Sequence, residues 1–79
     1  MNRSKKIRPL TDLAIDESAV VASVKLEPKE AGRLAELGLR VGAPVRILQA
    51  ASPNSPILTA VQDARIGVDH NAARRIYVF

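Results

Sequence analysis

Residues 27–42, EPKEAGRLAELGLRVG, constrain the fold more than any other stretch because they mark both ends of a helix. Pro28 suits the first helical position, where its missing N–H costs nothing. The apolar stripe of this helix recurs at helical spacing and consists of Ala31, Leu34, Ala35 and Gly38. Gly38 offers the left-handed backbone that ends a helix, and Gly42 precedes an extended run. The stretch predicts a short helix, a tight turn and a strand.

Strand patterns lie on both sides of this helix. Residues 19–26 alternate, which fits a sheet with one buried face: one set is Val20, Ala22, Val24 and Leu26, the other Val21, Ser23 and Lys25. Four further strands are predicted over residues 41–50, 57–62, 65–68 and 76–79. Val45 and Ile47 are expected to face inward. Ile57, Thr59 and Val61 are expected to share one face of their strand, and Ile76 and Val78 to alternate with Tyr77 and Phe79. Five short strands with one helix between the first and second predict a mainly β protein, a small, partly open barrel.

Composition limits how such a barrel is held together. The 79 residues suffice for one small domain, and the chain has no cysteine for disulfides or thiolate metal sites. Apolar residues make up 47% of the chain but aromatic residues only 3%, so the core must be aliphatic. No apolar run approaches the roughly 20 residues that span a membrane, and no apolar signal segment is present at the start. A cytoplasmic location is expected.

The net charge of +4 is confined to the start of the chain. Four of the twelve basic residues fall within residues 1–8, and the other eight basic residues balance the eight acidic ones. We therefore expect residues 1–8 to be a flexible basic tail and residues 9–79 to be the folded domain. A solvated tail is one reading. Electrostatic contact with anionic lipid or an acidic partner is another.

Catalysis and nucleic-acid binding find little support. An enzyme needs positioned acid–base or nucleophilic groups, and the single histidine, His70, is expected in solvent because it follows the helix cap Asp69. No catalytic residue is therefore predicted. A barrel that binds nucleic acid is expected to use stacking aromatic rings on a basic face. Tyr77 and Phe79 are the only aromatic residues, so nucleic-acid binding through the basic tail is kept as the alternative function.

Three segments carry a resemblance to a known family. LAELGLRVGAPVRIL at residues 34–48, PILTAV at 56–61 and IGVDHNAARRIYV at 66–78 resemble the FeoA family. The resemblance implies a small SH3-like barrel associated with ferrous-iron uptake. It also implies a partner, the cytoplasmic GTPase portion of a FeoB-type membrane transporter. The same domain occurs behind the winged helix of metal-dependent repressors. This sequence shows no such segment, so a stand-alone accessory protein is expected.

The link to iron raises the question of a metal site. Ferrous iron favours imidazole and carboxylate ligands, commonly two histidines and one carboxylate. The chain has one histidine, and Asp63 and Asp69 are its nearest carboxylates in sequence. We expect no dedicated metal site and no cofactor, while weak adventitious iron binding stays open.

The remaining function is recognition of another protein. Leu39, Arg40 and Val41 lie between Gly38 and Gly42, just beyond the helix. One hypothesis is an apolar docking patch edged by charges, made of Arg33, Glu36, Leu39, Arg40 and Val41. The alternative is that Leu39 and Val41 only cover the mouth of the barrel. The sequence favours a non-enzymatic cytoplasmic accessory protein that docks on the transporter and modulates it.

Overall fold

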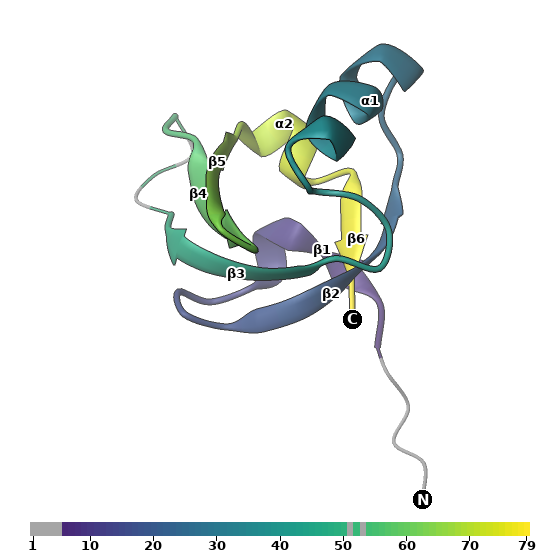
Figure 1. Cartoon of the computed structure of the whole chain (residues 1–79). Helices are drawn as coiled ribbons and strands as arrows, with labels where there is room; N and C mark the ends of the chain where they lie inside the picture. The colour runs from purple at the N-terminus through teal and green to yellow at the C-terminus, as the bar shows by residue number, and fades with distance from the viewer. Residues whose placement is uncertain (1–5, 51, 53) are drawn as a thin grey trace, which may run out of the picture.

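The polypeptide forms one curled antiparallel sheet with helices at its ends (Figure 1). The computed structural model describes residues 6–50, 52 and 54–79. Within these residues the strands are β1 (Arg8–Pro9), β2 (Ser18–Val24), β3 (Pro44–Gln49), β4 (Ile57–Val61), β5 (Ala64–Val68) and β6 (Ile76–Val78). The helices are the 3-10 helix η1 (Leu10–Asp12), α1 (Pro28–Glu36) and α2 (His70–Ala73). None of the described helices is both long and apolar enough to cross a membrane.

The strand order is β1-β6-β2-β3-β4-β5, and each neighbouring pair is antiparallel. The sheet curls around a core without aromatic side chains, whose largest fully buried members are Leu10, Leu39, Ile47 and Ile76. Strands β1 and β5 end the order, so the barrel is partly open between them. The predicted fold class is therefore confirmed. The strand that the sequence did not indicate is the two-residue β1.

Alternation along the strands holds wherever the register is regular. Val45 and Ile47 of β3 are buried, and so are the three residues of β4 that were predicted to share a face, Ile57, Thr59 and Val61. Strand β2 differs: Ala19 and Val21 are buried, whereas Val20 is only half-buried. The register against β6 shifts between Val21 and Ser23, and this bulge inserts one residue. Val24 and Leu26 then pack against the core, so the residues that face the core change from one alternating set to the other at the bulge.

Helix α1 begins with Pro28 and ends where the glycine pattern predicted. Gly38 has φ +105°, and its N–H donates to the carbonyl of Ala35 at 3.0 Å. The N–H of Leu39 donates to the carbonyl of Leu34 at 2.9 Å. These two bonds form a Schellman motif, which satisfies carbonyls that the helix end leaves free. Gly42 has φ +91° and donates to Val21 of β2, so the second glycine also has a backbone role.

Arg8, the last residue of the predicted tail, contacts the barrel. Arg8 pairs with Val78 in the sheet, and its guanidinium forms an ion pair with Glu17. Residues 1–5 of the predicted tail lie outside the described residues. Leu10 and Leu13 follow with both side chains buried, so the chain packs on the barrel from Arg8 onward.

Gly38→Ala tests the helix end against a matched control, Gly32→Ala. At position 38 an added Cβ would meet Val61 at an ordinary 3.5 Å, so the cost comes from the left-handed backbone. We expect a loss of about 1–2 kcal/mol in the free energy of unfolding. At position 32, inside α1, an added Cβ meets nothing within 4 Å. Chemical denaturation should show that Gly32→Ala stabilises by about 0.5–1 kcal/mol. Equal effects of the two changes would contradict this account.

Glu17 should make stability depend on pH. The backbone N–H of Ala14 and then the guanidinium of Arg8 hold the pKa of this carboxyl below its ordinary value. A lowered pKa in the folded state adds stability above the unfolded pKa of about 4.3, and that stability is lost as pH falls through the folded pKa. Glu17→Gln should therefore unfold more easily than the wild type at pH 7, and the difference should shrink towards pH 3. A difference independent of pH would contradict the assignment. Adding Arg8→Gln to Glu17→Gln should have little further effect.

Candidate docking site

Leu39, the centre of the docking patch expected between the two glycines, lies inside the barrel. Leu39 is 1% exposed and belongs to the core. The Schellman hydrogen bond to Leu34 turns the chain inward at Leu39, and Ala43 is buried at the other end of the loop. Val21 of β2 donates to Ala43 and accepts from Gly42, which fixes the loop across the barrel mouth. Leu39 therefore closes the barrel, as the alternative interpretation held.

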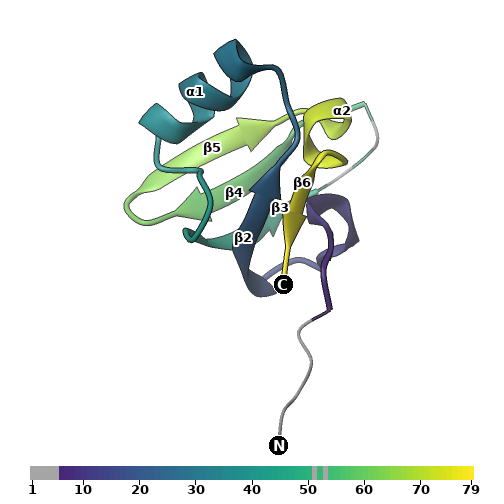
Figure 2. The same ribbon diagram turned by 90° about the vertical axis from the view of Figure 1, so that its right-hand side faces the viewer.

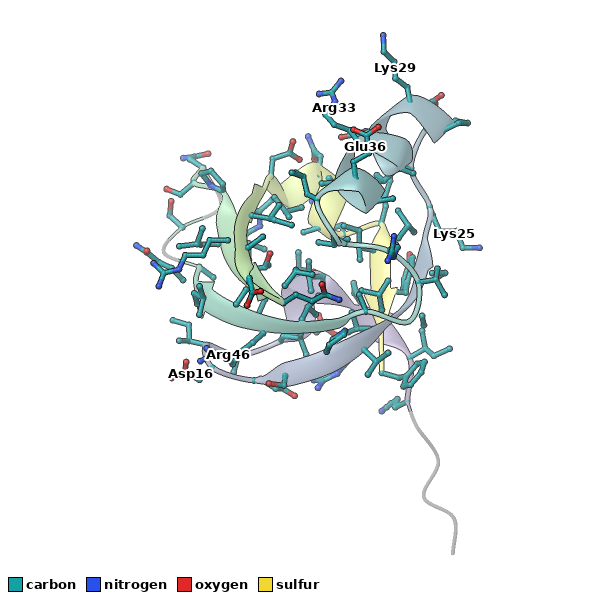
Figure 3. All side chains as sticks on the ribbon, in the orientation of Figure 1. Asp16, Lys25, Lys29, Arg33, Glu36 and Arg46 are labelled. Atoms are coloured by element: carbon teal, nitrogen blue, oxygen red, sulfur yellow. The ribbon has the colours of Figure 1, made fainter. Side chains whose placement is uncertain are left out.

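The other members of the predicted patch lie in solvent. Arg33 and Glu36 are exposed in the C-terminal half of α1 (Figure 3), and Arg40 is exposed in the loop. Val41 is 63% exposed, so it does not help to close the barrel. These residues are accessible, but with Leu39 inside the core they do not surround an apolar centre.

A different apolar surface is present beside α1. Leu37 is 51% exposed, although it directly precedes Gly38 at the helix end. Glu30, Arg33, Leu34 and Leu37 follow one another at i, i+3, i+4 and i+7, so they line one face of the helix. The sequence analysis counted the helical spacing from Ala31. Counting it from Glu30 to Leu37 instead identifies this face from the sequence.

This helix face forms one wall of a groove of about 220 Å³, which we call the α1–β5 groove. The facing wall comes from β5 and α2 and consists of Ile66, Gly67, Val68, Asp69 and Ala72. A second hollow of about 230 Å³ adjoins it and shares Glu30, Asp69 and Ala72. Strand β5 ends the strand order, so among the described residues no further strand covers this edge. The groove therefore lies where the barrel is open.

The chemistry of the α1–β5 groove suits binding rather than reaction. Leu34, Leu37 and Ile66 contribute apolar lining, and Glu30, Arg33 and Asp69 contribute charged groups. One of them, Asp69, already has a structural role, because its Oδ1 accepts a hydrogen bond from the N–H of Ala72 at 2.8 Å and caps α2. An apolar lining with a polar rim is typical of protein-docking surfaces.

His70 lies differently from the prediction. It begins α2 after the Asp69 cap, as expected, but it is half-buried and not solvated. Its Nε2 is buried and has no hydrogen-bond partner among the described residues. Within the same part of the chain, no group of three or more His, Cys, Asp and Glu side chains could hold a metal ion.

The fold is that of a small SH3-like barrel, with a groove between α1 and β5. The sequence model of the FeoA domain matches residues 8–78, and the chain belongs to the FeoA family. FeoA proteins are small accessory domains associated with ferrous-iron transport. A comparison with curated protein sequences gives no match.

Solved structures support the assignment. FeoA of Stenotrophomonas maltophilia in complex with zinc is 36% identical, with 90% of this chain and 88% of that chain covered and a TM-score of 0.73. The solution structure of FeoA from Chlorobium tepidum is 33% identical, with coverages of 89% and 67% and a TM-score of 0.83. A manganese-dependent transcriptional repressor shares the fold at 21% identity and a TM-score of 0.83. The match covers 96% of this chain and 42% of the repressor.

The expected lack of a dedicated iron site can be tested directly. Anaerobic calorimetric titration with ferrous iron should give no one-to-one isotherm of sub-micromolar affinity, because such a site needs several imidazole or carboxylate ligands held together. His70→Ala is the matched variant, since it removes the one imidazole. A tight one-to-one isotherm in the wild type that is lost in His70→Ala would overturn the expectation.

Proposed function

We propose that this protein is a non-enzymatic cytoplasmic accessory factor of ferrous-iron uptake that docks on a FeoB-type membrane transporter and modulates it. The observation that carries the proposal is the FeoA match over residues 8–78, nearly the whole chain. The Stenotrophomonas maltophilia relative is described as a prokaryotic SH3-domain protein and a candidate ferrous-iron transport activating factor. The cytoplasmic GTPase portion of the transporter is the proposed contact.

The α1–β5 groove is the proposed contact surface on this protein. A groove of about 220 Å³ has room for one or two apolar side chains of a partner segment. Its lining includes Leu37, which is half exposed in the isolated chain and would be covered on docking. Glu30, Arg33 and Asp69 at the rim can fix the orientation of the segment through charge. This surface replaces the loop centred on Leu39 and retains Arg33 from the original set.

Leu37→Asp tests the groove, and Ile15→Asp is its matched control. The side chains of Leu37 and Ile15 are similarly exposed, at 51% and 57%. Ile15 lies in the turn before β2, outside the groove. Burying one aliphatic side chain contributes about 1.5–3 kcal/mol, so Leu37→Asp should weaken binding to the purified transporter roughly 10- to 100-fold. Faster dissociation should account for most of the loss. Ile15→Asp should bind like the wild type.

Folding and charge need separate checks in this experiment. Circular dichroism and thermal unfolding should show both variants folded, because neither residue belongs to the core. Leu39→Asp is unsuitable, since a charge at that fully buried position would unfold the domain. Normal binding by folded Leu37→Asp would exclude the groove as the docking surface. The link to iron transport would then rest on the family alone.

A further inference from the structure

Helix α1 is only weakly attached to the barrel. None of its nine residues is buried, whereas the shorter helix α2 buries both Ala72 and Ala73. All residues of α1 are described by the structure, and of these only Leu34 packs against the core, where it is partly buried. Figure 2 shows α1 beyond the strands, at the opposite end of the barrel from the C-terminus. The helix therefore has little packing of its own.

Hydrogen bonds fix the chain on both sides of α1 rather than α1 itself. Before the helix, the N–H of Lys25 donates to the carbonyl of Arg75 at 2.8 Å. After it, the N–H of Gly42 donates to the carbonyl of Val21 at 2.8 Å. Within the described part of the chain, no side-chain hydrogen bond or ion pair joins α1 to another element. The two anchors can thus stay in place when the helix between them moves.

Two hollows adjoin the same helix. One is the α1–β5 groove of about 220 Å³, and the other, of about 230 Å³, is lined by Leu26 and Glu30 on the α1 side. Glu30 lines both, so the hollows meet at the first turn of α1. Protein interiors are close-packed and leave few voids larger than a water molecule. Hollows of this size mean that α1 lacks packing partners along the flank that faces β5 and α2.

We propose that α1 is a lid on the barrel, which opens as one unit between the anchors at Lys25 and Gly42 while the barrel stays folded. Local opening requires least free energy where few apolar contacts are buried and where backbone hydrogen bonds face solvent. A helix of nine residues is only marginally stable by itself in water. Once Leu34 leaves the core, α1 therefore loses its helical structure. Leu39 stays buried and holds the far end of the segment.

Opening of the lid removes one wall of the α1–β5 groove and one wall of the second hollow, because residues of α1 line both. The groove therefore exists only while the lid is closed. A ligand that binds in the groove shifts the lid towards the closed state, and a change that opens the lid weakens binding in the groove. The opening of α1 itself is tested without a partner and does not rest on the proposed docking function.

Native-state hydrogen exchange of the full chain, followed residue by residue by NMR, tests the lid. After correction for intrinsic rates, the amides of residues 31–36 should exchange about 100-fold faster than the hydrogen-bonded amides of β4. Their exchange should change little with low concentrations of guanidinium chloride, because unfolding one short helix exposes little surface. The β4 amides should exchange through global unfolding, which denaturant promotes steeply. Equal rates and equal denaturant dependence for α1 and β4 would overturn the proposal.

Leu34→Ala and Ile47→Val form a pair that separates opening of the lid from global unfolding. Leu34→Ala removes the contact of α1 with the core and should speed the exchange of residues 31–36 about tenfold. Ile47→Val weakens the core at β3 and should speed β4 exchange roughly three- to tenfold. It should leave α1 exchange unchanged, because Ile47 stays buried when the lid opens.

Two outcomes of this comparison would overturn the proposal. Ile47→Val could speed the exchange of α1 and β4 to the same degree, in which case α1 opens only when the whole barrel unfolds. Residues 31–36 could instead differ widely in their free energies of exchange, in which case the helix frays from its ends and does not open as a unit. One shared free energy across residues 31–36, lowered by Leu34→Ala and unaffected by Ile47→Val, is the expected result.

Discussion

The Schellman turn after α1 is the interaction that fixes the position of α1 and the burial of Leu39. Gly38 takes the left-handed backbone, and Leu39 then enters the core as one of its largest fully buried side chains. Helix α1 has no fully buried residue, and Leu34 is its partly buried contact with the core. Its position is therefore set by the turn more than by its own packing. The turn therefore also sets the shape of the α1–β5 groove, because one wall of the groove is a face of α1.

Periodicity predicted which residues share a face wherever strands pair without irregularity. Strands β4 and β5 pair through five consecutive positions, and their buried residues alternate regularly. Strand β2 does not follow this alternation along its whole length, because the bulge before Ser23 reverses it. A bulge depends on how two distant strands meet, and β6 lies more than 50 residues after β2. Nothing local to residues 18–24 indicates it.

For Leu39, in contrast, the local sequence was sufficient to predict burial. From the sequence, Leu39 was either part of an exposed docking patch or a cover over the mouth of the barrel. In a Schellman motif, however, the second residue after the cap commonly makes an apolar contact with the last turn of the helix. Leu39 occupies that position, so its burial follows from the helix end that was correctly predicted. Leu37 is the residue released to the surface. The ends of β3 and the start of β1 could not be predicted from the local sequence, because they depend on the strands that pair with them.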